Sequence, residues 1–223
     1  MLCITANLGC QCPLCAKTRH RAALATVFSM SELPKIAVVV SIASLLAVSP
    51  SALHAQSECD ARQILQPGNC IGDDLDALEI ELAKQINDYR LQNGLPAIPL
   101  SPALSLVANR HVRDLAMNIG RLTHDWSNCA MTDSNCMWKA PQRLGTSYPG
   151  NGFENAYGGP TGSPASPAAI LESWKEGGNG PHNDVILNRQ VWSNVHWRAL
   201  AIGIYDGFAT MWVGSKTDPT AGN

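Results

Sequence analysis

Apolar residues spaced three or four positions apart predict three amphipathic helices. We expect the first to start at Asp73 or Asp74 and to stop at Asn93-Gly94. The second should run from Ser101-Pro102 to Gly120, and the third from Ser166-Pro167 to Gly177, because serine followed by proline favours a helix start. The apolar positions that define these helices are Leu75, Leu78, Leu82, Ile86, Tyr89, Leu104, Val107, Ala108, Val112, Leu115, Ile119, Ile170, Leu171 and Trp174.

The pattern changes to alternation near the C-terminus, where large apolar residues at 200, 202 and 204 alternate with small ones at 199, 201 and 203. Asp206-Gly207 then separates this run from residues 208–214, which predicts a β-hairpin with a two-residue turn. The small-residue face would let a helix approach the sheet closely. Residues 95–100 should be extended, and residues 127–152 should form a long loop. Three helices and a short antiparallel sheet predict an α+β layered domain.

The first quarter of the chain has the pattern of an export signal. An uninterrupted apolar run from Ile36 to Val48 is followed by the small residue Ala55, which fits a signal-peptidase site. This pattern predicts a signal peptide over residues 30–55. A membrane anchor is the alternative, but the run is shorter than the roughly 18–20 apolar residues of a spanning helix. Residues 1–29 precede this signal as an unusual extension, so Met30 is a second candidate start. Cys12 and Cys15 within it are a weak metal or redox motif.

Removal of residues 1–55 would leave 168 residues with 12 basic and 17 acidic side chains, a net charge of −5. No basic run remains, which excludes nucleic acid as a partner. Four cysteines also remain: Cys59, Cys70, Cys129 and Cys136. An exported chain favours disulfides, and of the three possible connectivities we expect the local pairs 59–70 and 129–136. Both bridges would restrain loops rather than the core.

The candidate chemistry lies in His124, Glu154 and His182, which stand on three separate segments, with Asn155 beside the carboxylate. A fold that brings two imidazoles and a carboxylate together would create a cleft for zinc or another divalent metal. His111 lies on the apolar face of the second helix, where a structural histidine is expected. The run Gly177–Gly180 is interpreted as a turn, because it has neither the preceding strand nor the lysine of a phosphate loop.

An ordered set of motifs from Leu75 to Gly214 resembles the CAP superfamily, which includes cysteine-rich secretory proteins, antigen 5 and pathogenesis-related proteins, and most resembles its bacterial secreted members. The motifs are Ile86–Arg90, Gly94-Leu95, Ser101–Leu104, His111–Ala116, Thr123-His124, Glu154-Asn155, Trp174, His182, Ile202–Ile204 and Trp212. The resemblance implies an α-β-α sandwich over residues 73–214, preceded by a cysteine-containing segment 56–72 and followed by a tail 215–223. It also implies that His124, Glu154 and His182 belong to the central cleft.

The chain departs from this family in three places. The second acidic cleft residue of many members corresponds to Gly177 here, while Glu176 stands one residue early. Phe153 replaces the glycine that usually precedes Glu-Asn, and a cysteine-bearing insertion separates His124 from Glu154. The missing second acid leaves open whether the cleft binds a metal.

Three functions are consistent with these residues. The first is a secreted module, extracellular or periplasmic, that binds a metal, a lipid or another extracellular ligand, without stable membrane insertion after signal cleavage. The second is a metal-assisted hydrolase that uses His124, Glu154 and His182 around a zinc-bound water. The third is a purely structural cluster. The resemblance implies sterol or fatty-acid binding in some members, although no apolar groove is evident from the sequence. The lack of a GxSxG motif argues against a serine hydrolase, and the expected disulfides argue against a cysteine nucleophile.

Overall fold

The computed structural model describes residues 58–158 and 166–222, all of which belong to one compact unit. The predicted signal peptide and the extension before it lie outside the described residues. No helix within the described ranges is long and apolar enough to cross a membrane. The helices and strands are α1 (Ala77–Gln92), α2 (Pro102–Asp114), α3 (Ala140–Arg143), β1 (Phe153–Gly158), α4 (Pro167–Lys175), α5 (Pro181–Ile186), β2 (Ala199–Tyr205) and β3 (Phe208–Gly214). A π-helical turn covers Leu115–Ile119, and 3₁₀ turns cover Gln63–Leu65, Glu176–Gly178 and Gln190–Trp192.

The described strands form one antiparallel sheet in the order β1-β3-β2. The predicted hairpin is confirmed as β2 and β3, and both turn residues, Asp206 and Gly207, have the positive φ that a tight hairpin turn requires. Strand β1 was not anticipated. Its residues mix charged, amide and aromatic side chains, so no alternation of apolar and polar positions marks it.

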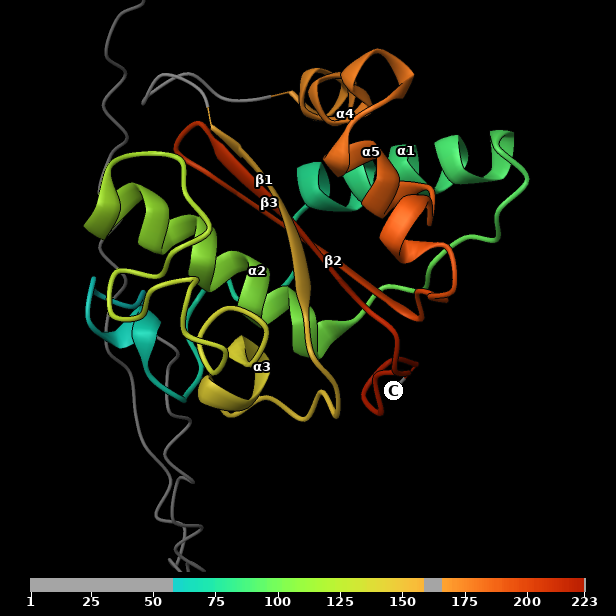
Figure 1. Cartoon of the computed structure of the whole chain (residues 1–223). Coiled ribbons are helices and arrows are strands. Elements are labelled where there is room, and N and C mark those ends of the chain that lie inside the picture. Colours follow the sequence, from blue (N-terminus) through green and yellow to red (C-terminus); the bar gives the residue numbers. More distant parts are fainter. Residues whose placement is uncertain (1–57, 159–165, 223) are drawn as a thin grey trace, which may run out of the picture. The chain divides into compact units, whose positions relative to one another are not determined.

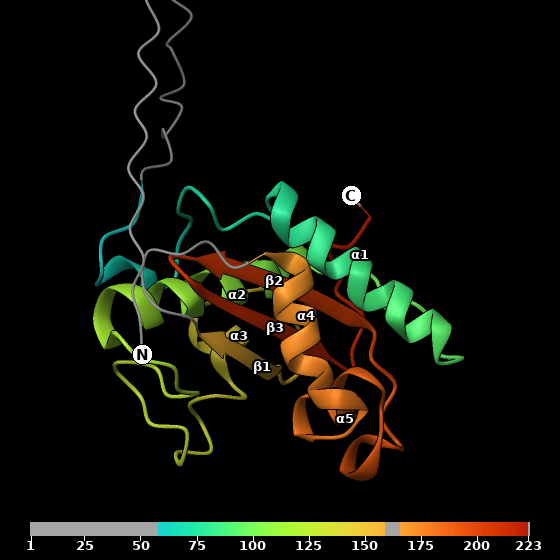
Figure 2. The same cartoon turned by 90° about the horizontal axis from the view of Figure 1, so that it is seen from above.

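Helices cover both faces of the sheet, with α2 on one face and α1, α4 and α5 on the other (Figures 1 and 2). The small face of β2 lies against α2, as expected. A Cβ on Gly203 would stand only 2.5 Å from the carbonyl oxygen of Ala108, so only glycine permits this approach. The large face, with Leu200 and Ile202, packs with α1 and α4. The predicted α-β-α sandwich is therefore confirmed.

The helix starts follow the predicted pattern except at α1. Ser101 and Ser166 cap α2 and α4 through their side chains. Helix α1, however, is capped by Asp76 in a capping box with Glu79, and not by Asp73 or Asp74. Asp73 is engaged elsewhere, because its carboxylate pairs with Arg110.

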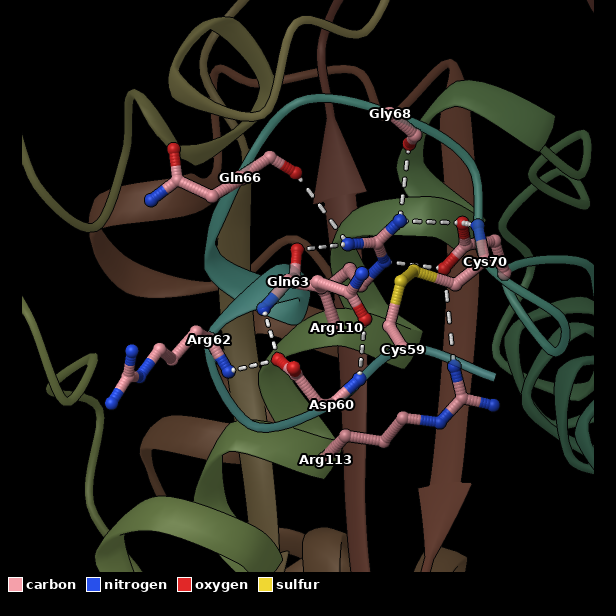
Figure 3. Close-up of a disulfide and its surroundings, with 10 residues drawn as sticks. Cys59, Asp60, Arg62, Gln63, Gln66, Gly68, Cys70, Arg110 and Arg113 are labelled. Atoms are coloured by element: carbon pink, nitrogen blue, oxygen red, sulfur yellow. Dashed lines mark hydrogen bonds and ion pairs between the residues drawn. A yellow bond between two sulfur atoms is a disulfide. The ribbon is translucent and has the colours of Figure 1, made fainter. Parts of the chain in front are cut away.

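Arg110 in α2 attaches the N-terminal segment to the domain (Figure 3). The guanidinium is fully buried and contacts both oxygens of Asp73, at 2.5 and 2.8 Å. It also donates to the carbonyl oxygens of Gln63 at 2.9 Å and Gly68 at 3.0 Å. These carbonyls belong to the loop that the Cys59–Cys70 disulfide closes. The buried guanidinium thus helps to fix the position of this loop, together with the buried Ile64 side chain.

Both predicted disulfides are confirmed, with Cα–Cα distances of 5.3 Å for Cys59–Cys70 and 5.6 Å for Cys129–Cys136. The expectation that they restrain only loops was wrong. Cys70 and Cys136 are both buried, and Cys136 packs in the apolar cluster between α2 and the sheet. The second bridge therefore ties the loop that contains it to the core.

Candidate functional site

The candidate site is built around Glu154 on β1, directly opposite Trp212 on β3. The Glu154 side chain is wholly buried. One carboxylate oxygen contacts Nδ1 of His111 from α2, and the other lies 2.7 Å from Nδ1 of His124 from the following loop. The strand, the helix and the loop thus each supply one member of a single buried cluster.

His111 belongs to this cluster, which was not anticipated from the sequence. The prediction of a satisfied structural histidine is correct in that the ring is buried and bonded on both sides, but its partner is the candidate site itself. The second ring nitrogen, Nε2, lies 3.1 Å from the backbone oxygen of Asp125. The ring also stacks on Trp126, with centroids 4.4 Å apart. The sequence shows only that His111 lies on the apolar face of a helix, and this position does not reveal which residue it contacts.

The hydrogen bonds among Glu154, His111 and His124 determine how the pKa values of these three residues are shifted. Burial alone would lower the pKa of His111, but the charge and hydrogen bond of Glu154 outweigh it, so the pKa is raised. The hydrogen bond to Glu154 likewise raises the pKa of His124, against a smaller effect of burial. Burial alone would raise the pKa of Glu154, but the two imidazoles lower it. Glu154 is therefore an anion stabilised by protonated or donating imidazoles.

A second carboxylate–imidazole pair joins Glu176 and His182. Nδ1 of His182 lies 2.7 Å from one oxygen of Glu176, and the His182 backbone N–H donates to the other at 3.1 Å. This geometry depends on the left-handed conformation of Glu176 at the end of α4, with φ of 50°, which turns the side chain back toward α5. Glu176 thus supplies an acidic partner although it stands one residue before the expected position.

The three predicted cleft residues are divided between two sets: His124 and Glu154 belong to the cluster with His111, whereas His182 pairs with Glu176. No hydrogen bond or ion pair between described residues links His182 to Glu154. The side chain of Asn155 donates to the carbonyl oxygen of His182 at 2.9 Å, which holds the second pair beside the same strand.

The histidine and carboxylate side chains of the site are candidate ligands for a metal ion. In residues 58–158 and 166–222, no three or more histidine, cysteine, aspartate or glutamate side chains are arranged to hold a metal ion. The Nδ1 atoms of His111, His124 and His182 face carboxylates, and Nε2 of His111 lies against the backbone oxygen of Asp125. The described residues therefore form no ready-made zinc site, and no step of the function proposed below depends on a metal. Zinc binding stays a prediction.

A pocket of about 220 Å³ adjoins His124 and Glu154. It is lined by His124, Met131, Met137, Trp138, Phe153, Glu154 and Trp192. The Glu154 side chain is wholly buried, whereas the His124 side chain is one-third exposed. His124 is therefore the polar side chain that a ligand in this pocket can reach. Its Nδ1 is held by Glu154, so Nε2 is the nitrogen left for a ligand, with no partner among the described residues.

The walls of the pocket coincide with two departures noted in the sequence. Phe153 occupies the position of the usual glycine, and its ring meets Trp192 edge-on at 5.0 Å. Met131, Met137 and Trp138 come from the insertion, where the Cys129–Cys136 bridge lies. The residues that distinguish this chain from its expected relatives therefore create the apolar surface beside His124.

Comparison with a family model supports the family assignment. The family model described as "CAP: Cysteine-rich secretory protein family" matches residues 83–205, more than half of the chain. One similar solved structure is an extracellular protein containing a SCP domain from Bacillus anthracis str. Ames, with 21% sequence identity and a TM-score of 0.46. The alignment covers 62% of this chain and 40% of that one, so the chain spans less than half of that protein. No curated protein matches the chain.

Proposed function

The chain belongs to the cysteine-rich secretory protein family, whose members are generally extracellular, and from that premise we propose that it is an extracellular ligand-binding module. The ligand site is the pocket beside His124. The observation that carries this proposal is the composition of the pocket, in which five apolar or aromatic side chains surround one oriented imidazole. Ligand sites in proteins typically combine apolar walls with a few placed polar groups.

The buried cluster behind the pocket acts as its support. Glu154 and His111 are both fully buried, so neither can meet a ligand directly. They instead orient the His124 ring, as buried carboxylates do for exposed imidazoles in many sites. A larger hollow of about 420 Å³ lies beside Arg121 and Trp126, but neither His124 nor Glu154 lines it. We therefore assign binding to the smaller pocket.

The proposal is tested by ligand-observed NMR of the full chain with a small set of neutral one-ring compounds. Truncation of Trp138 removes part of the pocket wall, so Trp138→Ala should weaken binding about fivefold. Tyr205→Ala is the matched control, because Tyr205 is as exposed as Trp138, at 40% for each residue, but lies outside the pocket. Equal effects of the two variants, or no binding by any compound, would contradict the assignment.

Metal binding is tested separately by native mass spectrometry with and without a chelator. Under the proposal, the exported protein carries no stoichiometric zinc. A retained zinc ion that is lost in His182→Ala would instead support the metal-binding alternative.

A further inference from the structure

The size of the pocket limits the ligand. An apolar cavity of about 150 Å³ is large enough to hold benzene, so about 220 Å³ accommodates one ring with one or two substituents. A whole sterol or a long acyl chain would extend far outside it. The inference rests on the proposed function and specifies which molecules the same pocket accepts.

The walls favour an aromatic ring. Phe153 and Trp192 already pack edge to face, which is the geometry that aromatic pairs prefer, and Trp138 is 40% exposed at the same pocket. Met131 and Met137 add thioether sulfurs, which make favourable contacts with ring edges. A flat ring can therefore contact aromatic and sulfur groups on several sides.

The polar end of the pocket favours a neutral hydroxyl group. Nε2 of His124 needs a hydrogen-bond partner, and a hydroxyl can serve as donor or acceptor, whichever form the imidazole takes. A carboxylate ligand could pair with His124 only when that imidazole is protonated, and it would lie near the negative charge of Asp125. The Asp125 carboxylate is held by the Met131 backbone N–H at 2.7 Å and by Thr123 at 3.0 Å.

We propose that the pocket binds small aromatic alcohols, with the ring between Phe153, Trp192 and the methionines and the hydroxyl on His124 Nε2. The class is defined by chemistry: one aromatic ring, one hydroxyl and little else. Loss of the hydroxyl removes one hydrogen bond to the partly exposed imidazole, which lowers affinity about threefold to tenfold.

The test uses the full chain labelled with ¹³C in the methionine methyl groups. Met131 and Met137 report on the pocket, while the exposed Met117 and the buried Met211 are internal controls. The probes are p-cresol, toluene and 4-methylanisole, which share the ring and differ in the polar group. We expect p-cresol to shift the two pocket methyl signals and to bind about threefold to tenfold more tightly than the other two compounds.

Variants separate the hydroxyl contact from pocket binding as such. His124→Phe keeps an aromatic ring but should abolish the preference for p-cresol, whereas the exposed His196→Phe should keep it. Equal affinity of the wild-type protein for all three probes would overturn the hydroxyl assignment and leave pocket binding intact. No shift of either pocket methyl signal with any probe would overturn both this inference and the proposed function.

Discussion

Glu154 is a buried anion whose two oxygens each meet an imidazole, so its replacement should have a large effect on stability. Glu154→Gln leaves the buried His111 without its counter-ion, and removal of one member of a buried pair costs about 3–5 kcal/mol. Glu176→Gln is the matched control, because Glu176 forms a similar pair at a position where its side chain is 26% exposed. Denaturant unfolding should show a loss several times larger for Glu154→Gln, and equal losses would contradict the structural role assigned to the cluster.

The same cluster predicts a pH dependence. The raised pKa values of His111 and His124 mean that their stabilisation is fully present below about pH 6.5 and is lost as the pH rises through their folded values. The lowered pKa of Glu154 gives stabilisation that is present above about pH 4.5 and is lost as the pH falls through its folded value. As the pH rises above about 6.5 the wild-type protein should therefore lose more unfolding free energy than Glu154→Gln, as urea titrations at several pH values would show. A parallel pH dependence of the two proteins would exclude this linkage.

At the level of elements, Glu79 links α1 to the rest of the sandwich. Its carboxylate accepts the backbone N–H of Ile204 on β2 at 2.8 Å and that of Asp76 at 2.9 Å. Burial raises its pKa from 4.5 to about 7 against these hydrogen bonds. A carboxyl group with a raised pKa destabilises the folded state increasingly as the pH rises from about 4.5 to about 7, by up to about 3 kcal/mol.

Glu79→Gln should flatten the stability profile in that lower window and leave its slope above pH 7 unchanged. The glutamine oxygen can still accept the Ile204 N–H, which keeps the contact between α1 and β2. The glutamine NH₂ group cannot accept the Asp76 N–H, so the variant should also lose a stability contribution that does not depend on pH. The measurement is again urea unfolding from pH 4.5 to pH 7. A wild-type profile that is already flat there would show that Glu79 stays charged in the fold.

The two disulfides should have similar effects on stability and different effects on binding. Closure of loops with cysteines 11 and 7 residues apart contributes about 2–3 kcal/mol each in the chain-entropy model. Serine replacement of Cys129 and Cys136 should also weaken p-cresol binding, because Met131, Met137 and Trp138 lie within or next to that bridge. Serine replacement of Cys59 and Cys70 should not change binding. The methyl-labelled titration described above, run on both double variants, checks this, and equal weakening in both would indicate a general loosening of the fold.

Elements with a clear period were predictable and the others were not. The helices that became α1, α2 and α4 and the β2–β3 hairpin follow from spacing and serine-proline starts, and α2 meets the small face of β2 as expected. Strand β1 was missed because Glu154 and Asn155 interrupt its apolar pattern.

For the site, local sequence could identify His124, Glu154 and His182 as candidates. It could not show that His111 reaches Glu154, since that contact depends on how α2 crosses the sheet.

At the scale of the whole molecule, both ends of the described chain are attached to α2. Near its start, the Ser101 hydroxyl donates to the buried Asp218 at 2.5 Å, so the predicted tail packs on the domain. Further along the same helix, Arg110 holds the N-terminal loop, as Figure 3 shows. The next residue, His111, faces the Glu154 cluster. One helix therefore positions both chain ends and the support of the candidate site.

This arrangement predicts that loss of the Arg110 side-chain charge destabilises the domain and releases residues 58–72. Arg110→Met would leave Asp73 and the carbonyl groups of Gln63 and Gly68 without their buried donor, at a cost of about 3–5 kcal/mol. Arg113→Met is the matched control on the same helix, because Arg113 is partly exposed and lies 3.9 Å from Asp73. Hydrogen exchange should show fast exchange of the N-terminal loop amides in the Arg110 variant alone. Equal protection in both variants would mean that the Cys59–Cys70 bridge, and not the buried guanidinium, holds this loop in place.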